Sequence, residues 1–172
     1  MRKAITIDYE EYDDERALPA ADAALLQQAR RCVENAYAPY SGFKVGAAVR
    51  LANGEIVCGS NQENAAFPSG LCAERVAVFA AGANHPGVPV AALAVAAQSA
   101  DGLSAHYPVS PCGACRESLM EYERRYGQPI RVILQGARRK IVVFEGVERL
   151  LPFRFEAEGI GADGAGQTKN GK

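Results

Sequence analysis

The sequence predicts one α/β domain, a three-layer α/β/α sandwich around a mixed sheet of about five strands. Two observations lead to this prediction. The chain has 172 residues, of which 48% are hydrophobic and 23% are charged, and this balance suits a globular domain with a buried core. Segments with the apolar pattern of strands also alternate with segments whose apolar residues recur at helical spacing, which is typical of helices packed on a sheet.

Residues 1–17 are predicted to form an arm ahead of the domain. Residues 4–7 alternate between apolar and polar side chains, which indicates a short edge strand, and the acidic residues 10–15 are expected to be a solvated loop. Pro19 suits the start of a helix because its φ is already fixed. Apolar residues then recur at helical spacing, so the first helix is predicted over residues 19–36.

A hairpin and a loop follow the first helix. The dipeptide Asn53-Gly54 lies between two apolar runs, residues 45–49 and 56–58, and it is a strong signal for a hairpin turn. Residues 61–70 are polar and contain proline and glycine, so they are predicted to form a loop.

The rest of the chain continues to alternate between helices and strands. Ser110 and Pro111 offer an N-cap and a proline at the first helical position, which together mark a helix start. Residues 159–172 are rich in glycine and are predicted to be a disordered tail, which leaves residues 18–158 as the domain. The further predicted elements are helices at residues 72–82, 111–127 and 147–151 and strands at residues 88–97, 130–134 and 141–144.

Charge and composition exclude several classes of function. The net charge is −1, so the chain lacks the basic surface expected of a nucleic-acid-binding protein. No apolar run approaches the roughly 20 residues that span a bilayer, so no membrane partner is expected. The N-terminus lacks the apolar region of a secretory signal. Five cysteines are an odd number that suits reduced thiols better than a disulfide framework, which predicts a cytoplasmic protein.

Three cysteines and one glutamate carry the strongest functional signal. Cys72 is followed two residues later by Glu74, and Pro111 precedes the pair Cys112 and Cys115. A catalytic zinc ion typically takes three protein ligands and leaves a fourth position to water, so the cysteines predict one Zn²⁺ per subunit. Glu74 is not needed as a ligand, and a carboxylate there can move protons to and from the water.

Both cysteine segments are predicted to begin helices. A helix N-terminus carries partial positive charge, which lowers the pKa of a thiol and favours the thiolate that zinc binds. Three thiolates around Zn²⁺ leave excess negative charge, which weakens the ability of the metal to acidify water. Arg75 is therefore predicted to bond to the ligand sulfurs, and Arg116 is a weaker candidate for the same role.

A structural zinc site is the alternative, and it would need a fourth protein ligand. Cys32 falls on the face of a predicted helix and Cys58 in a predicted strand, so both are expected to be core residues. His85 and His106 lie in loop-like segments, and spacing alone does not exclude them as ligands. The glutamate after the first cysteine favours the catalytic interpretation.

Several blocks of the sequence together resemble the small zinc-dependent cytidine deaminases, the homotetrameric type that acts on free nucleosides. The zinc segments match the signature of zinc nucleobase deaminases, in which x-E is followed by P-C-x-x-C. The resemblance runs from about Ala21 to Phe155, which is most of the chain, and its matching blocks occur in the order of that family. They are residues 36–48, 61–66, 108–116 and 150–152.

The resemblance implies a reaction and a set of site residues. Cys72, Cys112 and Cys115 would bind zinc, and Glu74 would carry protons between the activated water, the pyrimidine N3 and the leaving amine. Cytidine and 2'-deoxycytidine would be hydrolysed to uridine and 2'-deoxyuridine in pyrimidine salvage. The residues implied to contact the substrate are Phe43, Val45, Asn61, Glu63, Ala73 and Phe155.

The same resemblance implies which residues contact the sugar and which residue stacks on the base. Asn61 and Glu63 would hold the sugar hydroxyls, a role that suits an amide and a carboxylate. Phe155 would stack on the base across a subunit interface, within a homotetramer that shares its active sites. Phe153 competes for this stacking role, and Phe67 stands where the family often has tyrosine.

Other functions stay open at this level. The chain could act on another aminopyrimidine nucleoside or on a nucleoside antibiotic similar to blasticidin S. A non-catalytic zinc-stabilised interaction domain would instead fill the open zinc position with a protein ligand. A nucleic-acid-editing deaminase would need a basic groove along the strand, for which the balanced charge offers little support.

Overall fold

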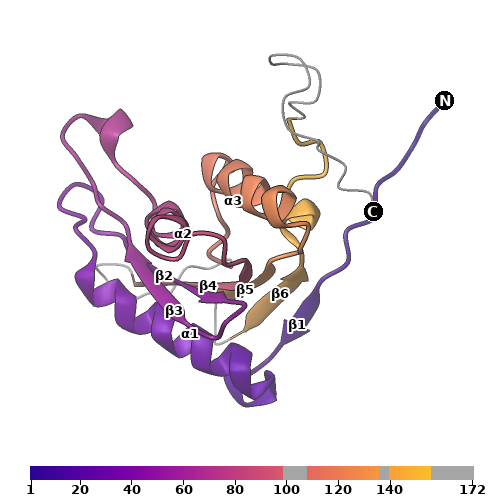
Figure 1. Ribbon diagram of the computed structural model, residues 1–172, viewed down its shortest axis with the longest axis horizontal. Helices are drawn as coiled ribbons and strands as arrows, with labels where there is room; N and C mark the ends of the chain where they lie inside the picture. Colours follow the sequence, from indigo (N-terminus) through magenta and orange to yellow (C-terminus); the bar gives the residue numbers. More distant parts are fainter. Residues whose placement is uncertain (99–107, 136–139, 156–172) are drawn as a thin grey trace, which may run out of the picture.

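The computed structural model describes residues 1–98, 108–135 and 140–155, and it has the predicted three-layer architecture. A mixed sheet lies between helix α1 on one face and helices α2 and α3 on the other (Figure 1). The described strands are β1 (Glu10–Tyr12), β2 (Lys44–Leu51), β3 (Ile56–Ser60), β4 (Val90–Gln98), β5 (Arg131–Gln135) and β6 (Ile141–Glu145). The described helices are α1 (Ala20–Cys32), α2 (Ala73–Asn84) and α3 (Gly113–Tyr126), with 3₁₀ turns η1 (Glu15–Ala17), η2 (Val33–Asn35), η3 (Phe67–Ser69) and η5 (Val147–Leu150).

The strand order across the sheet is β1-β6-β5-β4-β2-β3. Strands β4 and β5 are parallel, and the other neighbouring pairs are antiparallel. A parallel pair needs a crossover connection, and α3 lies in that connection. The hairpin predicted around Asn53-Gly54 is present as β2 and β3, with Gly54 at a φ of 89°. The predicted tail, residues 159–172, and the end of the predicted domain lie outside the described residues.

Alternating residues of the central strands bury two separate apolar layers. Ala47 and Val49 of β2 pack with α2 and α3, whereas Ala48 between them packs with α1. This is the period of a strand that is buried on both faces. A Cβ atom at Gly46 would collide with the backbone of α1 at Ala29, so the small residues of β2 let α1 lie directly on the sheet. Among the described helices, none combines the length and the apolar character needed to cross a bilayer.

The N-terminal arm differs from the prediction. Glu10–Tyr12 forms β1, which pairs antiparallel with β6, whereas residues 4–7 form no strand. The prediction of a solvated loop over residues 10–15 is therefore wrong for its first part, and the described residues contribute six strands to the sheet. Consecutive acidic residues rarely indicate a strand. In the fold, Lys140 of the neighbouring segment binds Glu11 and offsets part of the negative charge of β1.

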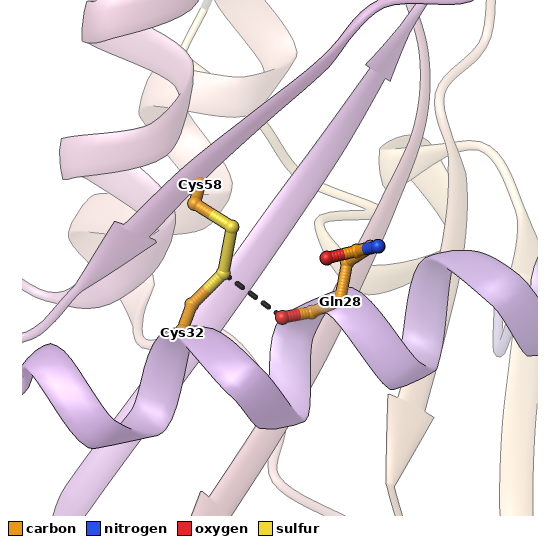
Figure 2. The surroundings of a disulfide bond; sticks show 3 residues. All are labelled: Gln28, Cys32 and Cys58. Atoms are coloured by element: carbon orange, nitrogen blue, oxygen red, sulfur yellow. Dashed lines mark hydrogen bonds between the residues drawn. A yellow bond between two sulfur atoms is a disulfide. The ribbon is translucent and has the colours of Figure 1, made fainter.

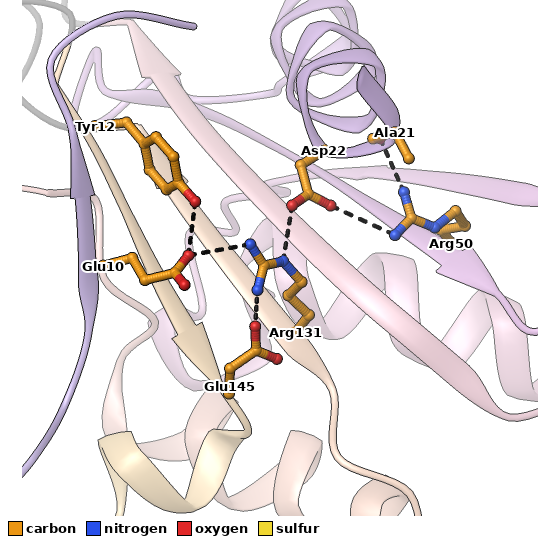
Figure 3. Close-up of polar contacts among 7 residues, drawn as sticks. All are labelled: Glu10, Tyr12, Ala21, Asp22, Arg50, Arg131 and Glu145. Atoms are coloured by element: carbon orange, nitrogen blue, oxygen red, sulfur yellow. Dashed lines mark hydrogen bonds and ion pairs between the residues drawn. The ribbon is translucent and has the colours of Figure 1, made fainter. Parts of the chain in front are cut away.

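A cluster of charged side chains ties β1 to the sheet and to α1 (Figure 3). Arg131 of β5 lies at its centre and contacts Asp22 at 2.7 Å and Glu10 at 3.3 Å. Arg131 also binds Glu145 at the end of β6. Arg50 of β2 contacts the other carboxylate oxygen of Asp22 at 3.5 Å. Asp22 is 3% exposed, so two arginines compensate for the burial of its charge.

Cys32 and Cys58 form a disulfide, with Cα atoms 5.9 Å apart (Figure 2). Cys32 is the last residue of α1 and is buried as predicted, whereas Cys58 lies in the middle of β3 and is exposed. The predictions that Cys58 is a core residue and that both thiols are reduced are therefore wrong. Because β3 is an edge strand, no further strand covers Cys58, although its side chain reaches α1. The local sequence pattern does not show that Cys32 and Cys58 are close in space.

Candidate metal centre and active site

The three cysteines of the sequence motif meet at the N-terminal ends of two helices. Cys72 is the N-cap of α2, Cys112 is the N-cap of α3, and Cys115 lies in the first turn of α3. The Sγ atoms of Cys72 and Cys112 are 3.7 Å apart, and those of Cys112 and Cys115 are 3.5 Å apart. All three sulfurs lie within 4.8 Å of one another and can hold one metal ion. Tetrahedral zinc with Zn–S bonds of about 2.3 Å separates its sulfurs by about 3.8 Å.

Helix α3 begins two residues later than predicted. Its N-cap is Cys112, and the hydroxyl of Ser110 does not cap the helix but accepts a hydrogen bond from Arg116 at 2.9 Å. The later start places the first sulfur of the pair at the helix boundary and the second within the first turn. Both therefore lie near the free N–H groups and the positive end of the helix dipole.

The thiols of Cys72 and Cys115 affect the pKa values of each other. Hydrogen bonding to Cys115 lowers the pKa of Cys72 to about 5, and Cys112 and Arg75 act in the same direction. The same hydrogen bond raises the pKa of Cys115, because a second negative charge beside a thiolate is unfavourable. A divalent cation between the sulfurs would offset the repulsion between neighbouring thiolates. A set of three thiolates around such a cation fits zinc.

Glu74 is the second residue of α2 and is 4% exposed. Burial raises the pKa of its carboxyl, and the negative charge of Cys72 acts in the same direction. Hydrogen bonding with Cys115 places the carboxyl beside the sulfur cluster. A carboxyl in this position can exchange protons with a molecule bound next to the sulfurs.

Two arginines adjacent to the cysteines have different partners. Arg75 hydrogen-bonds to Cys72 and Cys115. Partial burial acts to lower the pKa of Arg75, but the hydrogen bonds and negative charge of the sulfurs outweigh it and raise that pKa. Arg116 instead donates to the carbonyl oxygens of Pro111 and Leu150, both at 2.8 Å. Arg75 therefore offsets the charge of the sulfurs, while Arg116 joins the cysteine loop to η5.

The described part of the chain offers no fourth protein ligand. Within it, the three cysteines are the one group of His, Cys, Asp or Glu side chains close enough to hold a metal. His85 follows the last residue of α2, at the opposite end of that helix from Cys72, and its Nδ1 contacts Glu55 at 2.7 Å. His106 lies outside the described residues. Three ligands with an open position are the arrangement of a catalytic zinc site.

A cavity of about 270 Å³ connects Cys72 with the loop that follows β3. Two of the six predicted substrate residues, Asn61 and Glu63, line this cavity. The complete lining is Tyr40, Asn61, Gln62, Glu63, Asn64, Phe67, Gly70, Leu71 and Cys72. Three other cavities are larger, at about 660, 540 and 290 Å³, and none of the three cysteines lines them.

The other four predicted substrate residues do not line this cavity. Ala73 is fully buried, and Val45 packs against the apolar core. Phe43 is partly buried, and Phe155 is 65% exposed at the end of the described chain. Sequence reasoning did not assign Tyr40 or the apolar residues of the loop over 61–70 to the pocket, although large apolar side chains in a polar loop were an available signal.

Both ends of the Asn61 amide are hydrogen-bonded to the start of β2. Its Oδ1 accepts from the backbone N–H of Val45 at 2.8 Å, and its Nδ2 donates to the carbonyl oxygen of Phe43 at 3.0 Å. One N–H and one lone pair of the amide remain for other partners. Asn61 therefore fixes the segment that carries two predicted substrate residues, and it can still bind a hydroxyl.

Glu63 is held by the loop before β2. Its carboxylate accepts hydrogen bonds from the backbone N–H groups of Tyr40 at 2.9 Å and Ser41 at 3.2 Å, and from the hydroxyl of Ser41. The Ser41 hydroxyl lowers the pKa of Glu63, with the backbone groups acting in the same direction. The carboxylate is thus kept ionised and oriented at the cavity wall.

Comparison with known proteins decides the family. Residues 19–126 match the family model described as the cytidine and deoxycytidylate deaminase zinc-binding region. The chain belongs to the zinc-dependent cytidine deaminase family. It is 39% identical over 134 residues to a cytidine deaminase of Halalkalibacterium halodurans, which covers 78% of this chain and 93% of that protein. A cytidine deaminase of Mycobacterium tuberculosis is 36% identical over 106 residues, covering 61% of this chain and 74% of the relative.

Solved structures of cytidine deaminases share the fold. The crystal structure of cytidine deaminase from Burkholderia pseudomallei superposes with a TM-score of 0.65 at 39% identity, covering 77% of this chain and 97% of that chain. The enzyme from Mycobacterium tuberculosis gives a TM-score of 0.60 at 32% identity, covering 77% and 95%. The chain is therefore an enzyme of the cytidine deaminase type, and its zinc-binding region is the one that brings Cys72, Cys112 and Cys115 together. The matched region begins after the N-terminal arm.

Proposed function

We propose that the protein hydrolyses the 4-amino group of cytidine and 2'-deoxycytidine, which gives uridine or 2'-deoxyuridine and ammonia. One observation carries this proposal: three sulfurs converge at two helix N-termini, with a buried glutamate beside them. Cys72, Cys112 and Cys115 would hold one Zn²⁺. When bound, zinc would supply a Lewis acid that turns water into a nucleophile near neutral pH.

Glu74 is the proton carrier in this proposal. It would take a proton from the attacking water, deliver a proton to N3 of the pyrimidine and then protonate the amino group, which leaves as ammonia. Its burial supports the role because a carboxyl shielded from bulk water can keep the transferred proton between steps. Arg75 would stabilise the ligand sulfurs by the hydrogen bonds described above.

The loop after β3 would bind the sugar. Asn61 has a free N–H and lone pair, and the Glu63 carboxylate can accept from a sugar hydroxyl. Phe43, Val45 and the backbone at Ala73 would surround the base. The cavity of about 270 Å³ is close to the lower end of the range for small-molecule sites, which supports a free nucleoside and not a nucleic-acid strand.

We further propose that the enzyme is a homotetramer with shared active sites, working in cytoplasmic pyrimidine salvage. Three large aromatic side chains support further subunits because they are exposed on the single chain: Phe67 by 73%, Phe153 by 87% and Phe155 by 65%. Contiguous exposed apolar patches mark interaction sites, and these side chains would contribute to such patches between subunits. Phe155 would reach the base in a neighbouring subunit.

The test is ammonia release from a panel of cytidine, 2'-deoxycytidine, cytosine, adenosine and blasticidin S. We expect turnover of the first two, together with one equivalent of zinc per chain in the purified protein. Glu74→Gln keeps the shape of the side chain and should retain the metal, but lower turnover by about 10²-fold or more. Release from blasticidin S alone, or an active Glu74→Gln protein, would reject the proposal.

A further inference from the structure

The disulfide between Cys32 and Cys58 lies outside the zinc site, and the proposed reaction does not use it. Cys32 is 2% exposed, whereas Cys58 faces solvent on the edge strand β3. The bond joins the end of α1 to the middle of β3 (Figure 2). It is therefore a covalent link between two layers of the sandwich, and one of the two residues that form it is exposed.

The chain segments that leave the disulfide meet again at the proposed sugar-binding residues. From Cys32 the chain runs through η2 to Tyr37, and from Cys58 it runs to Asn61. The backbone N–H of Tyr37 donates to the carbonyl oxygen of Asn61 at 3.0 Å, and the N–H of Glu63 donates to the carbonyl of Tyr37 at 2.9 Å. The disulfide and these hydrogen bonds therefore join the two segments at both ends. The end opposite the disulfide forms the wall of the cavity.

The opposite face of β3 packs against α2, the helix that carries Glu74. A Cβ atom at Gly59 would collide with the backbone of Ala73 and Ala77 in the first turns of α2. Strand residues alternate in direction, so residue 58 faces α1 while residue 59 faces α2. A strand at the edge of a sheet has one neighbour to hold it, here β2. The covalent link therefore restrains the strand at the point from which the sugar-binding loop departs.

The site also accommodates the reduced state. The Sγ of Cys32 lies 2.9 Å from the carbonyl oxygen of Gln28 (Figure 2). A disulfide sulfur has no hydrogen to donate, whereas a thiol at this position can donate to that carbonyl. Reduction would exchange the covalent link for a hydrogen bond within α1 and would leave Cys58 as a free thiol on the edge strand.

We propose that Cys32 and Cys58 are a reversible thiol–disulfide site whose oxidation tightens nucleoside binding at Asn61 and Glu63. This inference rests on the proposed function for the identity of the ligand. The oxidant is a low-molecular-weight disulfide of the glutathione class. In a reducing compartment the pair is open, and a more oxidising thiol pool closes it.

The exchange balances in two steps. The thiolate of Cys58 attacks one sulfur of the small disulfide, which forms a mixed disulfide and releases one small thiol. The thiolate of Cys32 then attacks the Cys58 sulfur, which forms the protein disulfide and releases a second small thiol. Two electrons and two protons pass from the protein thiols to the small disulfide, and excess small thiol reverses both steps. Cys58 reacts first because it is the exposed partner.

The first experiment detects the bond without reference to activity. Protein equilibrated in a series of glutathione buffers is alkylated and digested without reduction, using trypsin together with a protease that cleaves after glutamate. Cleavage after Glu63 separates Cys58 from Cys72, which otherwise share a tryptic peptide. We expect a cross-linked Cys32–Cys58 peptide in oxidising buffers and alkylated peptides in reducing ones. Failure of the cross-link to form across the series would overturn the proposal.

The second experiment measures the effect on the substrate. We expect the KM for cytidine to be about three- to tenfold higher in the reduced protein, with kcat and zinc content unchanged. Cys58→Ser should show the higher KM in every buffer. Ile56→Ser is the matched control, because residue 56 is an exposed position on the same strand and face and the change leaves both thiols in place. It should keep the redox response. Equal KM values in both states would overturn the proposal.

Amide hydrogen exchange separates this inference from the proposed function. Residues 59–66 should exchange faster in the reduced protein whether or not cytidine is its substrate, and unchanged exchange there would overturn the inference. If cytidine is not deaminated but amide exchange responds to reduction, the proposed function is wrong. The inference that the disulfide controls the cavity wall is then still supported.

Discussion

The two edges of the sheet are held by different chemistry. At the β3 edge a disulfide and close backbone packing against α2 fix a strand that leads directly into the cavity. At the β1 edge the arm is held by ion pairs around Arg131 and Lys140 (Figure 3). A covalent link responds to redox conditions and ion pairs respond to salt and pH. We therefore assign the β1 edge to stability, whereas the β3 edge leads into the cavity for which nucleoside binding is proposed.

The largest effect is expected at Asp22, which connects the β1 edge to α1. Asp22→Ala leaves Arg131 and Arg50 without their shared buried carboxylate, and removing one partner of a buried pair lowers the free energy of unfolding by about 3 kcal/mol. Chemical denaturation measures this loss. Turnover per folded molecule should be unchanged, and a lower kcat with intact stability would contradict the assignment of this edge to stability.

Glu123 provides a buried carboxylate held by backbone groups instead of arginines. Its Oε1 accepts from the backbone N–H groups of Ile130 at 2.6 Å and Val147 at 2.7 Å. Glu123→Ala leaves both donors unsatisfied and should lower stability by about 2 kcal/mol, whereas Glu123→Gln keeps an acceptor oxygen and should lower it by less.

The Glu123 carboxyl also predicts the direction in which stability changes with pH. Burial raises the pKa of Glu123 above its ordinary value of 4.5, so the folded state binds this proton more tightly than the unfolded state. The resulting stabilisation is present at low pH and is lost as the pH rises through the raised value. Relative to Glu123→Gln, the wild type should therefore lose stability as the pH increases above 4.5, which denaturation at several pH values can follow. The opposite slope would show that the backbone hydrogen bonds dominate.

At the β3 edge the expected effect is on binding. Ser41→Ala removes the hydroxyl that holds Glu63 and should raise the KM for cytidine about fivefold, which corresponds to about 1 kcal/mol. The kcat should stay near that of the wild type. A double-mutant cycle with Glu63→Gln tests the coupling, since additive effects of the two changes would mean that Ser41 acts independently of Glu63.

The smallest effect is expected for Lys140, the other anchor of the arm. Lys140 and Glu11 are both more than 40% exposed, and surface ion pairs contribute less than about 1 kcal/mol. Lys140→Ala should lower stability slightly at low salt and not at all at high salt. A large, salt-independent loss would show that the arm is held by something other than charge.

The sequence was most informative where its signals are local. The cysteine motif combines fixed spacing with helix starts, each set within a few residues. Cys72 and Cys112 are 40 positions apart, and their convergence could be predicted because a zinc ion needs several ligands. The three-layer fold followed from the alternation of helical and strand periods in the same way. The predicted position of α3 was correct, but its predicted start was wrong by two residues.

Features that depend on distant residues and have no such motif could not be predicted. Strand β1 has acidic residues whose cations lie more than 100 positions away in the sequence, such as Arg131 for Glu10. The disulfide depends on where α1 lies relative to the β3 edge, which no local pattern encodes. The role proposed for Phe155 depends on another subunit, and a single chain leaves this side chain exposed.

The covalent link at the β3 edge also changes how damage to the chain would be seen. It closes a ring of backbone from Cys32 to Cys58, a separation of 26 residues, and the exposed Tyr40–Ser41 turn lies within that ring. One proteolytic cut in this turn would leave the two pieces joined, so an electrophoresis gel run without reductant would display a band of full mass. Only a gel run with reductant would reveal that such a preparation had been cut beside the proposed sugar-binding residues.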